Sequence, residues 1–207
     1  MKIVKPKIKI LVEKTLKDCL MEDDFTNALI NKNDDFININ HLTFDSCHLK
    51  NIDFQKLQFD ELNFIDVILE NCDLSNLNLN SMFLTRVEFH NCKLEGTTFI
   101  DANLKDIKIC DCNMKYVNFT NTLVTNMEIE SSDLSESIFY ETKIKNMFLE
   151  SIKFYKTEFV KTSLKDIDFT TCNLSGVLFD IYSLKGIKVN MFQCKDIIGA
   201  LEVVVVS

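Results

Sequence analysis

The sequence predicts a solenoid of square cross-section, in which the chain turns a corner after every five residues. An apolar residue stands at every fifth position from Phe44 to Val189 without a slip. A helix does not keep such positions on one face, because five steps advance about 140° around its axis. A flat strand does not either, because an odd number of steps alternates its two faces. Regular corners bring all of these residues inside, and four five-residue sides close one coil.

A second period of twenty residues supports the four-sided coil. We name each side after its first central residue: the Phe44, Leu49, Phe54 and Phe59 sides. If one coil lies on the next, like side chains stack along each side. The central residues of the Phe59 side are aromatic with one exception: Phe59, Leu79, Phe99, Phe119, Phe139, Phe159 and Phe179.

Cysteines recur on the Phe54 side, always two residues before a central apolar residue. The same slot also holds aliphatic and hydroxyl side chains, so it selects for small size. We therefore interpret the thiols as free, buried packing groups. The three histidines are scattered and no CxxC motif occurs, so neither a metal nor another cofactor is predicted. The slot holds Ile52, Cys72, Cys92, Cys112, Ser132, Ile152 and Cys172.

Composition excludes several classes of function. The chain has 207 residues, with 31 acidic and 23 basic ones and a net charge of −8, which disfavours direct nucleic-acid binding. No apolar run is long enough to span a membrane and no signal peptide is evident, so a cytoplasmic location is expected. No Ser/His/Asp set or glycine-rich phosphate loop is found, so the protein is predicted not to be an enzyme.

The repeated unit resembles that of the pentapeptide-repeat family. Its centre is Leu or Phe, a small residue stands two positions before, and Asp or Asn often stands just before, as in Asp53, Asn63 and Asp73. The match covers roughly residues 36–190. The resemblance implies an all-β fold, a right-handed quadrilateral β-helix of about 7 to 8 coils, closed at both ends by short helical caps.

The two ends lie outside the repeat. Residues 1–35 are predicted to form an N-terminal arm and cap, and residues 191–207 a C-terminal helix and strand. Asn190 is suited to cap a helix over Met191–Ala200, and Val203–Val206 has strong β propensity. An apolar stripe predicts a short N-terminal helix over the first coil: Leu11, Val12, Leu16, Cys19 and Leu20.

The C-terminal segment resembles the tail of Qnr-type and mycobacterial gyrase-protecting members of the family. The matching positions are Gly186, Lys188, Val189, Gln193, Ala200 and Leu201. In those relatives the tail joins two rods, so the resemblance implies a homodimer. Its candidate interface is Met191, Phe192, Ile197, Ile198, Leu201, Val203 and Val205.

The same resemblance suggests a DNA mimic that binds DNA gyrase or topoisomerase IV and protects it from quinolones or a peptide toxin. Residues 57–85 and 116–142 hold acids but no Lys or Arg, and the Phe59 and Leu49 sides carry most of the negative charge. Such patches can steer a basic partner. The candidate binding acids are Asp60, Glu61, Asp66, Glu70, Asp73, Glu128, Glu130, Asp133, Glu136 and Glu141.

A generic interaction scaffold without topoisomerase activity is the alternative. Apolar residues recur at positions of the Phe59 side that are expected to face outward, and a contiguous exposed apolar patch usually marks a protein contact. These residues are Ile100, Ile138, Tyr140, Val160 and Leu178. Both hypotheses stay open at this stage.

Overall fold

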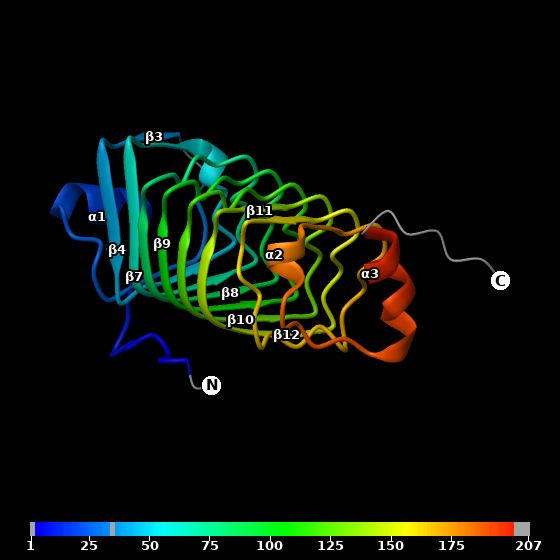
Figure 1. Ribbon diagram of the computed structural model, residues 1–207. Coiled ribbons are helices and arrows are strands. Elements are labelled where there is room, and N and C mark those ends of the chain that lie inside the picture. Colours follow the sequence, from blue (N-terminus) through cyan, green and yellow to red (C-terminus); the bar gives the residue numbers. More distant parts are fainter. Residues whose placement is uncertain (1–2, 34–35, 201–207) are drawn as a thin grey trace.

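A computed structural model describes residues 3–33 and 36–200 of the chain. It is a parallel β-solenoid of about 8 turns with short helices at its ends (Figure 1). The fold class predicted from the five-residue period is therefore confirmed. From β3 onward, strand partners lie twenty positions apart, as in Leu84 with Leu104 and Phe89 with Ile109.

The largest sheet has nine strands and covers the Phe44 and Leu49 sides. All of its strand pairs are parallel, as expected for successive turns of one coil. Its strands are β1 (Val12–Glu13), β2 (Ala28–Ile30), β4 (His41–Asp45), β5 (His48–Lys50), β7 (Glu61–Glu70), β8 (Phe83–His90), β9 (Asn103–Cys110), β10 (Leu123–Glu130) and β12 (Lys143–Glu150).

Shorter strands form the Phe59 side. One sheet there joins β11 (Ile138–Tyr140), β13 (Glu158–Val160) and β14 (Leu178–Phe179), and another joins β3 (Ile37–Asn38) and β6 (Leu57–Gln58). The Phe54 side holds the short 3-10 helix η1 (Phe54–Lys56) and pairs through isolated bridges, such as the one from Asp73 to Lys93. The sheet is thus continuous on two sides and punctuated by turns on the other two.

Left-handed backbone makes the corners. The residue two positions after a centre has a positive φ at almost every coil side, for example 55° at Asn71 and 51° at Asn91. Asn and Asp tolerate this conformation better than most residues, so the chain turns corners with only four glycines. The Asp or Asn before a centre assists, because its side chain accepts the amide two residues on: Ser75 donates to Asp73 over 3.0 Å.

The central residues fill the interior. All of them from Phe44 to Val189 are buried except Phe59, Ile144, Leu184 and Val189, which are half-buried. The aromatic residues of the Phe59 side stack from coil to coil, with centroids 5.3 Å apart for Phe99 and Phe119. The stack continues to Phe179, as the sequence predicts.

The cysteine slot of the Phe54 side is buried, and the thiols of Cys72, Cys92 and Cys112 donate a hydrogen bond that hydroxyls make in the equivalent slot of the Phe59 side. The Cys72 thiol donates to the Leu49 carbonyl over 3.4 Å, and the Thr97 hydroxyl of the Phe59 side donates to the Leu74 carbonyl over 2.7 Å. Both acceptors lie 23 residues earlier in the chain. A thiol and a hydroxyl therefore do the same task, and all eight cysteines are free. In the same slot of the Leu49 side, burial raises the pKa of the Cys47 thiol to about 11, which keeps it protonated and unreactive.

A helix and a strand close the N-terminal end. α1 (Leu16–Glu22) begins at a capping box between Thr15 and Asp18 and buries Leu16 and Cys19. The predicted stripe is correct for these two residues, but Leu11 and Val12 lie before the helix, and Val12 belongs to the exposed strand β1. Parallel pairing starts early: β2 already pairs with β5.

Three helical segments close the other end: α2 (Ile181–Leu184), the 3-10 helix η2 (Met191–Gln193) and α3 (Cys194–Ala200). Asn190 caps η2 and forms a capping box with Gln193, which confirms its predicted role. The Gln193 amide also donates to the carbonyls of Phe169 and Cys172, both over 2.7 Å.

Within the described part of the chain, no helix is long and apolar enough to cross a membrane.

Truncating the aromatic stack should destabilise the whole rod. Phe139 is 1% exposed and its ring lies 4.8 and 4.7 Å from those of Phe119 and Phe159. We expect Phe139→Ala to lower the free energy of unfolding by about 3–5 kcal/mol in urea titrations. Phe83→Ala, at a position that is 61% exposed, is the control and should change it by less than about 0.5 kcal/mol. Equal losses for the two variants would contradict this account of the core.

Two glycines test the corner geometry. Gly96 has a φ of 70°, and an added Cβ would meet the side-chain oxygen of Asn76, whereas Gly199 lies in α3 with open space around it. Gly96→Ala should therefore lower the free energy of unfolding by about 1–2 kcal/mol or more. Gly199→Ala should leave it unchanged or raise it by up to about 1 kcal/mol. Thermal unfolding of both variants measures this, and a harmless Gly96→Ala would refute the strained corner.

Candidate functional site: the acidic face of the main sheet

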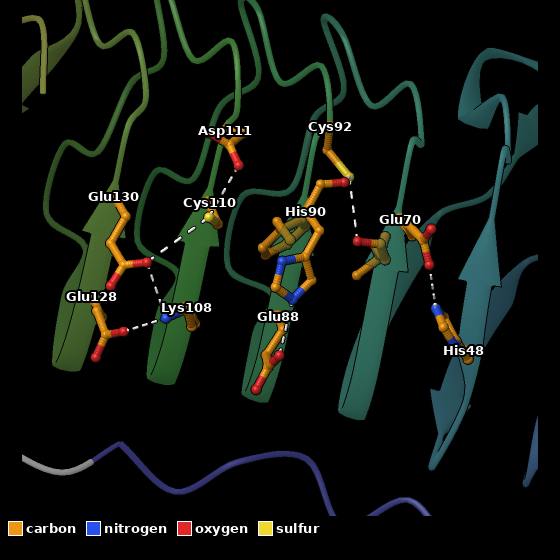
Figure 2. A network of polar contacts seen from close by, with 12 residues as sticks. His48, Glu70, Glu88, His90, Cys92, Lys108, Cys110, Asp111, Glu128 and Glu130 are labelled. Atoms are coloured by element: carbon orange, nitrogen blue, oxygen red, sulfur yellow. Dashed lines mark hydrogen bonds and ion pairs between the residues drawn. The ribbon is translucent and has the colours of Figure 1, made fainter. Parts of the chain in front are cut away.

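The Leu49 side presents a regular array of charged side chains to solvent. Figure 2 shows residues of β5, β7, β8, β9 and β10 lying side by side across this surface. Because the strands are in register, residues twenty apart become neighbours. We call the carboxylates of this array the acidic sheet face: Glu70, Glu88, Glu128, Glu130 and Glu150.

Lys108 occupies the centre of the strongest polar contact on this face. Its ammonium lies 2.5 Å from a Glu128 carboxylate oxygen and 3.2 Å from one of Glu130 (Figure 2). The hydrogen bond that Lys108 donates to Glu128, assisted by the one to Glu130, raises the pKa of Lys108 above its usual value. One lysine thus serves two carboxylates, which leaves a net negative charge at this point.

Two histidines extend the array toward the N-terminal end. The Glu70 carboxylate lies 3.0 Å from Lys50 and 3.1 Å from His48, and the hydrogen bond with Lys50 lowers its pKa. Burial lowers the pKa of His48, so that ring is neutral at pH 7. His90 contacts Glu88 over 2.9 Å. Of the two partners of Glu70, only Lys50 therefore carries a full positive charge, and Glu70 stays ionised beside it.

The structure distributes the ten predicted binding acids around the rod. Glu70, Glu128 and Glu130 share the acidic sheet face. The others lie on other sides or at corners, because each acidic stretch of sequence winds through more than one full turn. Asp60 is on the Phe59 side, Asp73 and Asp133 are on the Phe54 side, and the acids at corners are Glu61, Asp66, Glu136 and Glu141.

Most of these acids have a positively charged or titratable partner twenty positions away. Examples are Lys93 with Asp73 at 3.3 Å and Lys161 with Glu141 at 2.9 Å. A lysine outside an acidic stretch of sequence is therefore in contact with it in the fold. The remaining pairs at this spacing are His41–Glu61, Lys50–Glu70, Arg86–Asp66, Lys108–Glu128 and Lys153–Asp133.

Asp66 differs from the other acids because it is buried under the N-terminal arm. Arg86 holds its carboxylate through contacts of 2.6 and 2.7 Å, and the Lys7 amide donates to it over 2.8 Å. Only 6% of Asp66 is exposed. The arm reaches further along the same corner, where the Val4 amide donates to Asp106 over 3.4 Å. We therefore leave Asp66 out of the proposed binding face.

The chemistry available on this face is that of charge and hydrogen bonding. Across residues 3–33 and 36–200, no group of three or more His, Cys, Asp or Glu is placed to hold a metal ion. Cys110 stands between Asp111 and Glu130, and desolvation followed by the hydrogen bond to Asp111 raises its pKa to about 11. Its thiol is therefore a poor nucleophile.

The candidate dimer interface is exposed where the structure describes it. Met191 and Phe192 are 84% and 85% exposed, Ile198 is 36% exposed and Ile197 is half-buried. Leu201, Val203 and Val205 lie outside the described residues. The homodimer itself stays a prediction.

The fold defines the class of the protein. A parallel solenoid with inward central residues and a charged outer surface is a β-solenoid repeat protein. Two family models match within it: pentapeptide repeats over residues 41–76 and a pentapeptide repeat region over residues 82–134. The chain is a pentapeptide-repeat protein. No curated protein matches its sequence.

Solved structures with a similar chain path include two of this fold. QnrB1, a plasmid-mediated fluoroquinolone resistance protein, is 16% identical, with 86% of this chain and 89% of that chain covered and a TM-score of 0.36. HetL, involved in heterocyst differentiation regulation in the cyanobacterium Nostoc, is 14% identical, with 84% and 94% covered and a TM-score of 0.42. At this level of similarity they carry no information about this chain's partner.

The buried Asp66–Arg86 pair should make stability depend on pH. The hydrogen bond from Arg86 lowers the pKa of Asp66 below its usual value of 3.8. A depressed folded-state pKa stabilises the fold above 3.8, and the contribution is lost as the pH falls through the folded-state value. Asp66→Asn should therefore cost about 1.5–3 kcal/mol at neutral pH.

The difference between wild type and Asp66→Asn should shrink below pH 3.8. Urea unfolding at neutral and acidic pH measures it. Asp60→Asn, at an exposed position, is the control and should cost less than about 0.5 kcal/mol throughout. A gap that is equally large in acid would rule out the carboxylate as its source.

Proposed function

We propose that the protein is a non-enzymatic binding protein whose acidic sheet face engages a basic surface that otherwise receives duplex DNA. The observation that carries this proposal is the row of carboxylates on β7, β8, β10 and β12, set on a rigid parallel sheet. Adjacent strands are spaced by about 4.8 Å, so these charges form a fixed linear array. A basic groove that recognises a regular series of phosphates presents the complementary pattern.

The partner that we propose is a type II topoisomerase, DNA gyrase or topoisomerase IV. The sequence resemblance of the C-terminal tail to gyrase-protecting proteins supports this choice, as does the net charge of −8. Protection against a quinolone or a peptide toxin is the corresponding biological outcome, with the protein acting in the cytoplasm.

The array is weaker than duplex DNA, which fixes how it would bind. Lys50 and Lys108 neutralise part of it, since each contacts carboxylates of the face directly. DNA carries one charge for about every 1.7 Å of its axis, far more than this surface. Binding would therefore rest on local patches such as Glu128–Glu130, and would weaken steeply as salt screens them.

A scaffold for an unrelated protein partner is the second candidate. It is favoured by apolar side chains at outward positions of the Phe59 side, among which Leu178 is 53% exposed and Tyr140 is 36% exposed. Ile100, Ile138 and Val160 are half-buried there. A partner held by this surface would depend little on salt, which separates it from the acidic sheet face.

Reversing two charges of the acidic sheet face should abolish topoisomerase binding. We expect the wild-type protein to inhibit gyrase supercoiling, or to reduce fluoroquinolone-stabilised DNA cleavage, at low salt. Glu128→Lys with Glu130→Lys should weaken the effect about tenfold or more, because attraction becomes repulsion at the densest patch. Dose-response curves in the two assays measure it.

The matched control changes the net charge equally on other sides. Glu95→Lys with Glu158→Lys alters exposed positions of the Phe54 and Phe59 sides and should leave the effect within about twofold of wild type. Circular dichroism checks that both variants fold. If wild type leaves both gyrase assays unchanged at micromolar concentration, or if the two double variants lose activity alike, the proposed function fails.

A further inference from the structure

The main sheet ends before the C-terminal end of the rod. β12 is its last strand, although the chain winds through a further coil and into the C-terminal cap. On the other two sides the ladder continues past this point, with Lys153 bridged to Asn173 and Phe159 paired with Phe179. Residues 163–170 instead join the last coil, where Asp168 is bridged to Lys188. One side of β12 is therefore an open edge, which we call the β12 seam.

The backbone of the seam has no partner strand. Elsewhere an amide donates to the carbonyl 19 positions on, as Asn91 does to Cys110 and Ser131 to Glu150. The equivalent donors of β12 are the amides of Ile144, Asn146 and Leu149. Throughout the described residues, no backbone hydrogen bond joins β12 to residues 163–170. Such an edge is a template for another strand.

The seam also opens the core locally. Val124 and Met127 of β10 are fully buried, but their counterparts twenty residues later, Ile144 and Met147, are only half-buried. Both side chains point inward by register, so it is the missing neighbour strand that exposes them. An added strand that turns the same corner at Asn146 would bury them by placing its inward side chains over this gap.

The rim of the seam is basic in an acidic protein. A cleft of about 630 Å³ lies beside it, with Lys143, Lys145 and Lys161 among its lining residues. Lys161 is neutralised by Glu141 at 2.9 Å. Lys143 and Lys145 form no ion pair with any described residue. Two unpaired cations at outward positions of an open strand select a ligand with carboxylates in matching positions.

We propose that the β12 seam binds an extended acidic segment of a partner protein, which adds to β12 as a further strand. Its backbone would accept from the amides of Ile144, Asn146 and Leu149. Apolar side chains would cover Ile144 and, past a bend that follows the corner at Asn146, Met147, while acidic ones would face Lys143 and Lys145. This site does not depend on the acidic sheet face. It binds an acidic segment, whereas the acidic sheet face is proposed to bind a basic surface.

Synthetic peptides test the seam directly on the full-length protein. The probe is a fluorescein-labelled peptide of sequence Glu-Val-Glu-Gly-Val-Glu-Val, whose glycine allows it to follow the corner at Asn146, compared with the same peptide carrying lysine in place of glutamate. Fluorescence anisotropy should give a dissociation constant at least about tenfold lower for the glutamate peptide. Hydrogen exchange followed by NMR should show the amides of Ile144, Asn146 and Leu149 slowed about tenfold or more by this peptide.

A matched pair of variants controls for charge. Lys143→Glu with Lys145→Glu should weaken binding of the glutamate peptide about tenfold. Lys93→Glu with Lys153→Glu, at exposed positions of the Phe54 side, changes the net charge equally and should leave it within about twofold. Thermal unfolding checks that both variants fold.

Several outcomes would overturn the proposal. One is that the free protein protects Ile144, Asn146 and Leu149 as strongly as Val124, Asn126 and Ile129, because then the edge is not open. Equal binding of the two peptides, or binding without protection of β12, would exclude recognition by this seam. Concentration-dependent protection without peptide would make a second copy of the chain the occupant. None of these results bears on the gyrase assays, so the two proposals fail separately.

Discussion

The left-handed corner is the constraint on which the rest of the structure depends. Each positive φ, such as 55° at Asn71, redirects the chain so that the next central residue again points inward. A coil closes after four corners, which places residues twenty apart in contact. The aromatic stack, the shared hydrogen bond of the cysteine slot and the ion pairs on the outside all follow from that one spacing.

The interior was predictable from the sequence because buried positions recur as apolar residues at a fixed period. The central slot is apolar in every coil, so Phe99, Phe119 and Phe139 reveal their contact by period alone. The outer surface shows no such period, since outward positions need only be polar, and its contacts therefore cannot be read from the pattern. Thus the run from 116 to 142 holds no basic residue, yet Lys108 and Lys161 contact its acids. Comparing residues twenty positions apart, and not the total charge of a stretch or of a side, finds these pairs.

Two further features of the outer surface were beyond sequence reasoning for a related reason. The N-terminal arm binds the corner at Asp66 through backbone amides, and an amide carries no sequence signal. The open edge at β12 could not be predicted from the sequence either. The segments Leu123–Glu130 and Lys143–Glu150 have the same order of inward and outward residues, although only the first has a partner strand on both sides. Whether a strand has a partner depends on the path of the next coil, and here residues 163–170 pair with the last coil instead of with β12.

The polar seal over the last coil has a consequence for the size of the object. Gln193 takes up the carbonyls of Phe169 and Cys172, which another repeat would otherwise use, and α1 covers the opposite end. Within the described residues, neither end coil therefore offers its ladder to an identical molecule, which opposes growth into filaments through the ends. The length of the solenoid is therefore set by the number of repeats between its two caps.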